Sequence, residues 1–429
     1  MPRAAPPRLP AAVEVVIVGG GIVGVSAAWH LAERGMSVLL CEKGEIGQEQ
    51  SGRNWGWCRN TLRSPAEIPL MQQSLSDWRS AEVFGGLATG FRTTGILYFT
   101  GRTRGDRQAY ESWLASVRGF GLDSRMATRE EVGALVPGCV ELPGKGALYT
   151  ASDGCAEPGL AAPAIAAAAA ARGAIIRSNC AVRSVEQGAG RLCAVVTEHG
   201  AVRCDAAIVA GGAWSRLFAG NLGLDLPALN VMGSVMRTAP LAGGPGVSVA
   251  GRRFGWRKRA DGGFVLSQAD ATIFDIVPDS FRLLNAFRPM IGTGLRQLRL
   301  RVGRSFWREL TTPRHWQADQ VSPFERMRLA APQPSKRVLR EALLRAGEAM
   351  PVFREAEIVE SWGGLIDVTP DALPIIGPSA RLPGLHYATG FSGHGFGLGP
   401  GGGRLISDLV QGRAPVVDAA AFRPARFGL

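Results

Sequence analysis

Features that direct a chain to a membrane, to secretion or to a metal are missing from these 429 residues. No apolar run approaches the ~18 residues of a membrane-spanning helix. Residues 1–12 carry prolines and arginines where a signal peptide has its apolar core, so we expect a flexible leader there. The seven cysteines form no CxxC pair. Reduced thiols and a cytoplasmic location are therefore expected, and no metal site.

Lysine is also scarce, since only four of the 48 basic residues are lysine although the net charge is +12. Such a positive charge is typical of proteins that bind nucleic acid, an anionic membrane or an acidic substrate. The aromatic residues lie in glycine-rich loops instead of alternating with basic ones, which disfavours nucleic acid. Within 282–345, arginines recur with apolar residues: Arg296, Arg299, Arg301, Arg304 and Arg308 with Leu295, Leu298, Leu300, Val302, Phe306 and Trp307. This segment predicts either a solvated face or contact with a partner or the inner face of a membrane, where the chain would be peripheral.

A nucleotide-binding fingerprint opens the chain. Residues 13–41 predict a buried strand, a helix and a second buried strand. Gly19 permits a tight turn, Gly21 lets the backbone approach a pyrophosphate, and Gly24 lets helix and strand pack closely. Glu42 follows the second strand, where a carboxylate accepts hydrogen bonds from ribose hydroxyls and repels a 2′-phosphate. FAD or NAD is therefore favoured over NADP.

The order of predicted elements indicates an α/β protein, α+β overall. Beyond the alanine-rich helix that Gly173 ends, three short strands around 174–177, 182–185 and 192–197 are predicted to form a meander. A buried strand at 206–210 then returns to the parallel sheet, and a hairpin turns at 261–263. We expect a Rossmann-like nucleotide-binding domain over 13–64, 147–225 and 358–413. An interleaved mixed β-sheet substrate domain is expected over 65–146 and 226–357, with a helical insertion at about 282–349.

The polar loop at 47–60 contains two tryptophans, Trp55 and Trp57. Indole rings in a glycine-punctuated loop are costly to expose unless they cover something. We interpret the loop as a wall of the cofactor pocket. The alternative is a loop anchored only to its own domain.

Taken together, six segments resemble the D-amino-acid oxidase-like superfamily of FAD-dependent amine and amino-acid oxidoreductases, which includes glycine oxidase, sarcosine oxidase and D-amino-acid dehydrogenase. Each segment alone is unspecific, but they follow the order of the family from about residue 13 to 413. They are the fingerprint with Glu42, and the segments 51–54, 148–158, 208–215, 369–377 and 390–395.

This resemblance implies that FAD lies extended, with its ring beneath the loop after Ser51. The glycine-rich start of the C-terminal helix would face the flavin N1 and C2 oxygen, where reduction deposits negative charge. The cofactor-binding residues so implied are Gly19, Gly21, Gly24, Glu42, Lys43, Ser51, Arg53, Asn54, Val182, Gly211, Trp214, Gly364, Ile366, Gly393, Gly395, Phe396 and Gly397.

Two departures from the family pattern concern chemistry. Members with covalent flavin carry a cysteine just before the Thr-Pro-Asp segment, whereas this chain has Gly363 to Ile366, so non-covalent FAD is expected. Glycine oxidase and its relatives place a carboxylate-binding arginine where Ile366 stands, and isoleucine cannot replace a guanidinium. Either another arginine holds a carboxylate, with Arg59, Arg63 and Arg314 as candidates, or the substrate presents its amine first.

Four residues are candidates for catalysis: Trp55, Arg59, Asp367 and His394. Asp367 could pair with a substrate ammonium or help to deprotonate it, or it could only cap amides of its own turn. His394 could act directly, or it could only shape its loop.

These expectations lead to a function. The resemblance implies oxidation of a secondary amine, D-amino acid or opine-like compound by hydride transfer to flavin N5, with oxygen or a quinone as electron acceptor. Two alternatives stay open: a 2-hydroxy-acid dehydrogenase, and a flavoprotein subunit of a hetero-oligomeric dehydrogenase.

Overall fold

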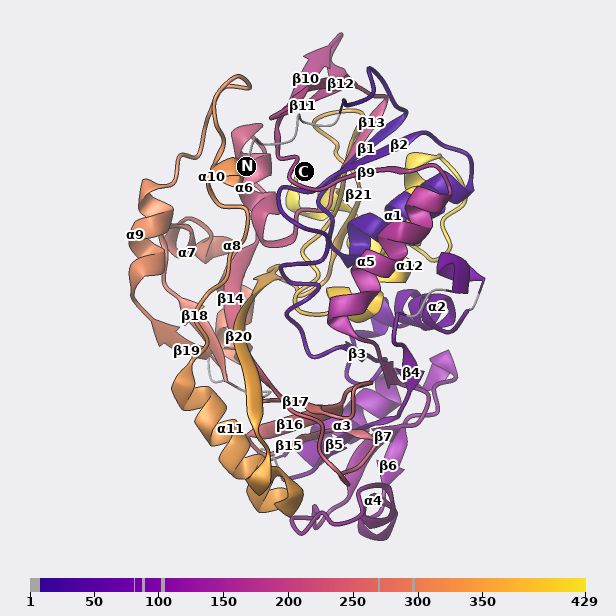
Figure 1. Ribbon diagram of the computed structural model, residues 1–429, viewed down its shortest axis with the longest axis vertical. Coiled ribbons are helices and arrows are strands. Elements are labelled where there is room, and N and C mark those ends of the chain that lie inside the picture. The colour runs from indigo at the N-terminus through magenta and orange to yellow at the C-terminus, as the bar shows by residue number, and fades with distance from the viewer. Residues whose placement is uncertain (1–7, 81, 87–88, 102–104, 269–270, 295–297) are drawn as a thin grey trace.

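A computed structural model describes residues 8–80, 82–86, 89–101, 105–268, 271–294 and 298–429 of the chain. Residues 1–7 of the expected leader, and Leu295 and Arg296 of the basic segment, lie outside the described residues. Two sheets organise the rest, one with its helices in the upper half of Figure 1 and a larger one in the lower half.

The smaller of the two main sheets is the expected parallel one. Its strand order is β21 (Ile375–Pro378), β22 (Leu385–Thr389), β13 (Ala206–Val209), β1 (Val15–Val18), β2 (Val38–Cys41) and β9 (Ile175–Arg177). All neighbouring pairs are parallel except β21 with β22. The central strands are buried apolar runs, as strands covered on both faces must be.

The predicted meander is partly wrong. Ile175–Arg177 (β9) pairs with β2 at the edge of the parallel sheet. The three-stranded meander instead consists of β10 (Val182–Gly188), β11 (Arg191–Thr197) and β12 (Gly200–Arg203). Local patterning shows that a short strand exists, but its partner is set by residues far away in the sequence.

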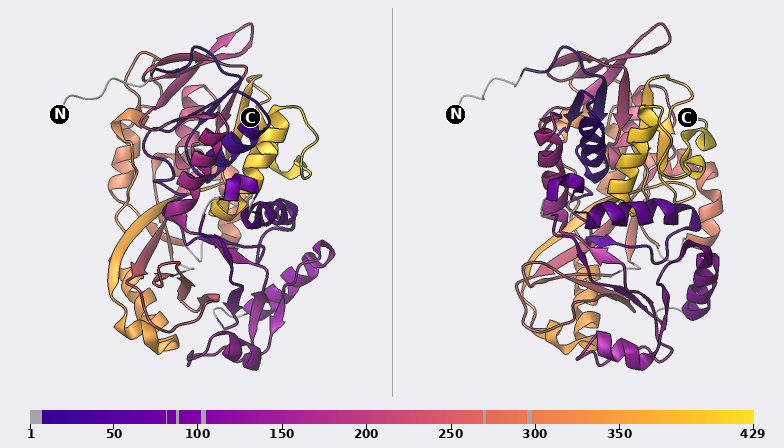
Figure 2. Two further views of the ribbon diagram at one scale, coloured as in Figure 1. Left: turned by 45° about the vertical axis from the view of Figure 1, so that its right-hand side comes forward. Right: turned by 90° about the vertical axis from the view of Figure 1, so that its right-hand side faces the viewer.

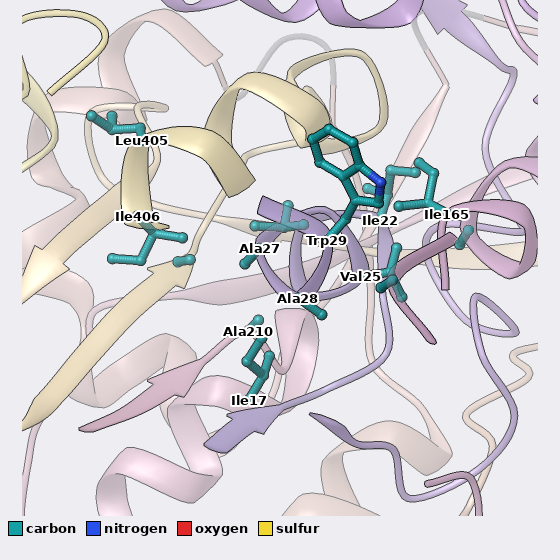
Figure 3. Packing of buried hydrophobic residues seen from close by; sticks show 14 of the residues in the cluster. Ile17, Ile22, Val25, Ala27, Ala28, Trp29, Ile165, Ala210, Leu405 and Ile406 are labelled. Carbon is teal, nitrogen blue, oxygen red and sulfur yellow. The ribbon is translucent and has the colours of Figure 1, made fainter. Parts of the chain in front are cut away.

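Three helices cover one face of the parallel sheet: α1 (Ile22–Glu33), α5 (Pro158–Ala171) and α12 (Gly395–Val410). Figure 3 shows Ile22, Val25 and Trp29 of α1 among side chains of α5 and α12. On the other face, the meander and α6 (Ser215–Asn221) enclose a second apolar cluster.

Glycines allow α12 to lie between α1 and α2 (Ile68–Arg79). A Cβ on Gly399 would lie 2.7 Å from Ile22, and one on Gly403 would lie 2.5 Å from Ser26. A Cβ on Gly401 would lie 2.7 Å from the carbonyl oxygen of Leu70. Glycine lowers helix propensity, so tertiary packing rather than local preference keeps this segment helical.

The larger sheet carries the second half of the molecule. Its order is β19 (Leu298–Arg301), β18 (Thr272–Asp275), β14 (Leu229–Thr238), β17 (Phe264–Ser267), β16 (Phe254–Lys258), β15 (Ser248–Gly251), β5 (Ile96–Phe99), β7 (Ala147–Thr150) and β6 (Arg125–Ala127), with β20 (Ile358–Val368) paired to β14. The predicted hairpin is confirmed as β16 and β17. Helix α11 (Lys336–Ala349) packs on this sheet, and α3 (Asp106–Ser116) and α4 (Arg129–Leu135) lie near its β5–β6 end (Figure 2).

The insertion at 282–349 is not purely helical. It contains α8 (Leu284–Gly294), α9 (Arg304–Thr311), α10 (Pro323–Arg326) and α11, but also strand β19, which extends the large sheet beside β18. Helix α7 (Pro278–Arg282) precedes it. Among the described residues, no helix is both long and apolar enough to cross a membrane.

Candidate active site

A cavity of about 510 Å³ lies where the two main sheets meet. Its walls include the carboxyl ends of β1, β2 and β13, the middle of β14 and the end of β20. The loop at 47–63 and the start of α12 complete it. Ligands of open parallel sheets bind beyond the carboxyl ends of the strands, so this is the expected position for a dinucleotide.

The fingerprint glycines have the backbone geometry that the sequence predicts. Gly19 has φ +114°, and a Cβ there would lie 2.5 Å from the carbonyl oxygen of Ala210. Gly21 precedes α1 and lines the cavity. Gly24 lies outside the cavity lining, where a Cβ would clash with the carbonyl oxygen of Gly19. The helix can therefore start close to the strand, and the amides of its first turn that follow Ile22 are available to a phosphate, while the Ile22 amide donates to Ser51.

Glu42 lines the cavity at the end of β2. Its Oε2 accepts from the amide of Gly20 and its Oε1 from the amide of Gly44, both at 2.7 Å. Burial raises the pKa of Glu42, against the effect of these amides. Each carboxylate oxygen keeps acceptor capacity, so the fixed carboxylate fits ribose hydroxyls.

Lys43 and Trp214 line the same region. The ammonium of Lys43 lies 4.4 Å from the Trp214 ring centroid and 2.6 Å from Oε1 of Glu49. Trp214 donates from Nε1 to Oε2 of Glu49 at 2.7 Å. Val182 and Gly211 also line the cavity, so these four predicted cofactor residues surround one space.

Hydrogen bonds to α1 and to β20 hold the loop at 51–54 in place. Ser51 accepts from the amide of Ile22 at 2.8 Å, and Asn54 donates to the carbonyls of Gln50 and Ser51. The carbonyl of Arg53 accepts from the Trp362 indole at 3.0 Å. A Cβ on Gly364 would lie 3.0 Å from that same carbonyl oxygen, so β20 passes close beneath the loop.

The start of α12 supplies the predicted amide cradle. Gly393 has φ +82° and lines the cavity together with Gly395, Phe396 and Ile366. Gly397 lies outside the lining, where a Cβ would lie 3.2 Å from the carbonyl oxygen of Trp57. The partial positive charge of the helix start therefore faces the cavity, as negative charge on a reduced ring requires.

Asp367 lines the cavity but is already occupied by protein donors. It is 4% exposed, its Oδ1 accepts from Gln50 at 2.8 Å, and its Oδ2 accepts from the amide of Gly390 at 2.8 Å. Burial raises the pKa of Asp367. Both oxygens of Asp367 thus already bind protein donors, which lie far away in the sequence, so Asp367 joins separate segments of the site and does not cap its own turn.

Of the three candidate arginines, two line the cavity. Arg59 lies over the Tyr98 ring at 5.5 Å and donates to the carbonyl of Thr61. Arg63 is 3% exposed, and burial followed by the charge of Arg59 lowers its pKa to about 9. Arg314 lies elsewhere, because it pairs with Asp279 at 2.7 Å.

His394 lines the cavity just before α12 and is held by a carboxylate that the sequence analysis missed. Its Nδ1 lies 2.8 Å from Oε1 of Glu67, which is fully buried. Burial, then the charge of Arg63, lowers the pKa of His394 to about 4, although Glu67 opposes the shift. The imidazole is therefore neutral at neutral pH, and a proton on Nδ1 leaves Nε2 as an acceptor.

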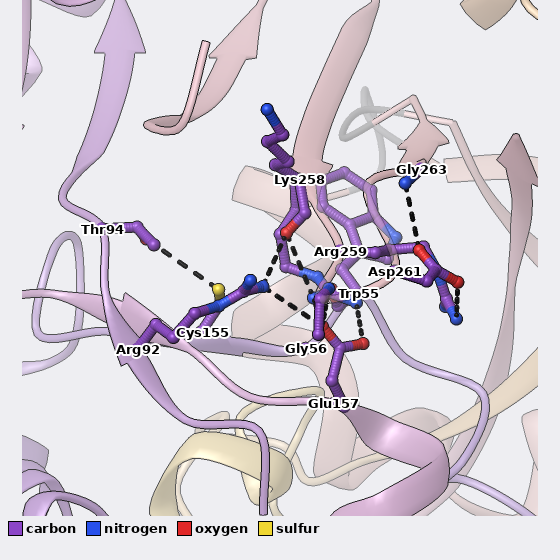
Figure 4. Close-up of polar contacts among 12 residues, drawn as sticks. Trp55, Gly56, Arg92, Thr94, Cys155, Glu157, Lys258, Arg259, Asp261 and Gly263 are labelled. Carbon is purple, nitrogen blue, oxygen red and sulfur yellow. Dashed lines mark hydrogen bonds and ion pairs between the residues drawn. The ribbon is translucent and has the colours of Figure 1, made fainter. Parts of the chain in front are cut away.

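Trp55 and Trp57 both line the cavity, with ring centroids 4.9 Å apart in an edge-to-face arrangement. Figure 4 shows what holds this wall. Arg257, 1% exposed on β16, donates from Nε to the Trp55 carbonyl at 2.5 Å and forms a two-armed pair with Glu157. The wall is thus tied to both the large sheet and the start of α5, as the pocket interpretation predicts.

Several supporting residues were not found from sequence. Gln50 bridges Asp367 and the amide of Ala213, and Asp153 accepts from the amides of Asn60 and Thr61. Glu67 completes a capping box with Ser64, a local signal that hides its second contact with His394. Of these residues, only Glu67 had a recognisable local pattern, its capping box with Ser64.

These observations fit FAD. The glycine turn, the backbone amides at the start of α1 and Glu42 match the diphosphate and ribose, and the α12 cradle beside the Trp55 wall matches a flavin ring. Within the described residues, no cluster of three or more His, Cys, Asp or Glu could hold a metal.

Comparison with known proteins agrees with this geometry. The FAD dependent oxidoreductase family, DAO, matches residues 14–409. Glycine oxidase of Pseudomonas putida is 24% identical, over 96% of this chain and 98% of its own length. Mouse dimethylglycine dehydrogenase is 27% identical over 99% of this chain, but the chain spans only 45% of that protein. The structure of L-amino acid deaminase from Proteus myxofaciens in complex with anthranilate aligns with a TM-score of 0.93 and 34% identity, covering 98% of this chain and 95% of that one.

The resemblance to the D-amino-acid oxidase-like superfamily is thereby confirmed, together with the mixed α/β fold and the choice of FAD over NAD. This chain belongs to the DAO family of FAD-dependent oxidoreductases.

Proposed function

We propose that this enzyme oxidises an amine or an amino acid by removing a hydride from the carbon that bears nitrogen. The iminium so formed loses its N–H proton to water, and the resulting imine hydrolyses. The observation that carries the proposal is the pair Arg59 and Arg63 in the cavity wall beside a neutral His394. Two neighbouring guanidinium groups provide a site for a substrate anion. The similarity to an L-amino acid deaminase over nearly the whole chain supports an amine-bearing substrate.

When bound, FAD supplies the hydride acceptor, N5 of its ring. The protein positions the substrate and stabilises the charges that are present during the reaction. Arg59 and Arg63 hold an anionic group of the substrate, and the amides that begin α12 stabilise negative charge next to them. Trp55 and Trp57 exclude water from the reacting carbon, because their indoles form the wall beside the arginines.

The test is anaerobic bleaching of the bound flavin by a panel of secondary amines, D- and L-amino acids and opine-like compounds. At least one amine or amino acid should bleach the flavin, while 2-hydroxy acids should not. Bleaching by none of the nitrogen compounds would contradict the proposal.

A 2-hydroxy-acid dehydrogenase is the second candidate, and one observation favours it. A hydroxyl substrate needs a base, and the buried Glu67 orients His394 as a carboxylate orients a catalytic histidine. Rapid bleaching by a 2-hydroxy acid, with none by amines, would establish this candidate in place of the first.

The exposed surface of helix α9 bears on where the enzyme acts and on what reoxidises the flavin. Helix α9 exposes Trp307 (65%) and Leu310 (54%), with Arg304 and Arg308 exposed on the same short helix. We propose that this basic, apolar surface rests on an anionic membrane at the cytoplasmic side and that a quinone reoxidises the flavin. Co-sedimentation with phosphatidylglycerol vesicles but not phosphatidylcholine vesicles is expected. Stoichiometric hydrogen peroxide during turnover would instead identify oxygen as the acceptor.

A further inference from the structure

One buried side chain of the cavity wall, Gln268, is not among the residues that hold the substrate anion or the flavin ring. Gln268 follows β17 directly, lines the cavity and is 6% exposed. The preceding Ser267 donates to the carbonyl of Ser234 at 2.7 Å and pairs with Gly255 of β16. A Cβ on Gly255 would lie 3.0 Å from the Trp55 ring, so the strand that supports the tryptophan wall, β16, is paired directly with the strand that positions Gln268, β17.

The Oε1 atom of Gln268 has no hydrogen-bond partner among the described residues. A buried acceptor without a partner destabilises the protein, and buried polar groups in proteins are normally paired. Two further groups of the same cavity are unpartnered donors: Nη1 of Arg63 and Nε1 of Trp57. The cavity therefore offers one buried acceptor and two buried donors, which complements a ligand with an N–H group and an anionic group.

Among the described residues, four carboxylates line the cavity, and each already accepts from protein donors. Glu42 binds two backbone amides, Glu45 binds the side-chain amide of Asn179, Glu49 binds Lys43 and Trp214, and Asp367 binds Gln50 and Gly390. A substrate amine therefore meets a neutral acceptor in this part of the cavity.

We propose that Gln268 accepts a hydrogen bond from the substrate amine while Arg63 binds the substrate's anionic group. This inference rests on the proposed function, and it assigns to two residues the task of orienting the carbon that loses hydride. Gln268 is a specificity residue, and Arg63 is its cationic counterpart.

A neutral acceptor has a chemical consequence. A carboxylate at this position would stabilise an ammonium and hold its proton, whereas an amide oxygen does so far less. The charged groups that line this part of the cavity are Arg59, Arg63 and Asp367, and the neutral imidazole of His394 lies beside them. The two guanidiniums disfavour a further positive charge there, and Asp367 favours it. The amine can therefore be neutral when it reacts, as loss of a hydride from the adjacent carbon requires.

The test compares two unreactive ligands of the flavin-loaded enzyme, benzoate and 2-aminobenzoate, by their perturbation of the flavin spectrum. Gln268→Met should weaken 2-aminobenzoate about tenfold, the worth of one hydrogen bond, and change benzoate by less than about twofold. Arg63→Met should weaken both ligands about tenfold or more, because both carry the carboxylate. Gln187→Met, on the exposed end of β10, is the matched control and should change neither.

Equal effects of Gln268→Met on both ligands, or no effect on either, would overturn the assignment. Gln268→Glu adds a second readout, because a carboxylate should move the pH profile of kcat/KM to higher pH for an amine substrate. A failure of the proposed function is seen separately, since the wild-type flavin would then bleach with no amine or amino acid, whatever the ligand affinities of the variants.

Discussion

Nη1 of Arg257 lies 2.9 Å from Oε1 of Glu157, and both side chains are buried where the large sheet meets the start of α5. Although burial opposes it, the Arg257 guanidinium lowers the pKa of Glu157. Arg92 and the amide of Ala260 add further bonds to the same carboxylate (Figure 4). One carboxylate thus joins the two halves of the molecule beside the Trp55 wall.

Glu157→Gln should therefore be strongly destabilising, because it leaves the Arg257 guanidinium buried without a counter-charge. Breaking one partner of a buried pair costs about 3–5 kcal/mol. Glu111→Gln, in the exposed pair with Arg107, is the control and should cost less than about 1 kcal/mol. Thermal unfolding followed by tryptophan fluorescence compares them, and equal midpoints for the two variants would refute the role of the pair.

Much of the nucleotide-binding half could be predicted from sequence because its signals are local. The strand, the glycine turn and the helix of 13–41 follow from periodicity and spacing, and Glu42 follows from its place at the end of the second strand. The same locality explains the error at Ile175–Arg177, where the strand was recognised but its pairing with β2 was not.

The substrate end of the cavity could be predicted only in part. Arg59, Arg63 and His394 were recognised as candidates, but nothing local indicates that Glu67 reaches His394 across 327 positions of sequence. The contact exists because η1 (Pro65–Glu67) and the start of α12 meet at the cavity wall. Gln268 carried no motif either, since an unpaired amide becomes visible only once the surrounding side chains are in place.

The fingerprint provides a second prediction, because Gly24 has no room for a side chain. Gly24→Ala would force a methyl group against the carbonyl oxygen of Gly19 and displace the start of α1 from β1. We expect most of the bound FAD to be lost, measured as flavin absorbance per purified chain. Gly159→Ala is the control, since a Cβ there meets nothing within 4 Å in an exposed first turn of α5. Full flavin content in Gly24→Ala would contradict the assigned packing.

His394 separates the two candidate reactions. A general base contributes about 100- to 10,000-fold to a rate, so His394→Asn should abolish oxidation of a 2-hydroxy acid. With an amine substrate that reacts neutral, the same change should lower kcat/KM by less than about 100-fold. His315→Asn, at an exposed position, is the control. A loss greater than 100-fold with an amine would make His394 the base for amine oxidation as well.

The last prediction concerns a buried cluster between α1, α2 and α12, where Nε2 of His30 lies 4.0 Å from Oδ2 of Asp77. Burial, then the charges of Arg34 and Arg404, lowers the pKa of His30 to about 3. Burial raises the pKa of Asp77 to about 6, from 3.8. Below pH 6.5 the unfolded chain binds the His30 proton and the folded chain does not. His30 therefore makes the folded protein less stable as the pH falls. Between pH 3.8 and 6 the folded chain binds the Asp77 proton and the unfolded chain does not, so Asp77 offsets that loss.

Asp77→Asn removes the offset without changing the size of the side chain. The variant should lose about 1.4 kcal/mol more stability per pH unit than the wild type between pH 6 and 4, because one proton is no longer taken up by the folded chain. Unfolding transitions at pH 7, 6, 5 and 4 measure this, with Asp225→Asn as a surface control, because the side chain of Asp225 is 80% exposed beside its partner Arg216. Parallel pH profiles for wild type and Asp77→Asn would show that Asp77 is ionised in the folded enzyme. A steeper profile confined to the variant would instead show that His30 alone makes this helix cluster acid-sensitive and that a protonated Asp77 protects it.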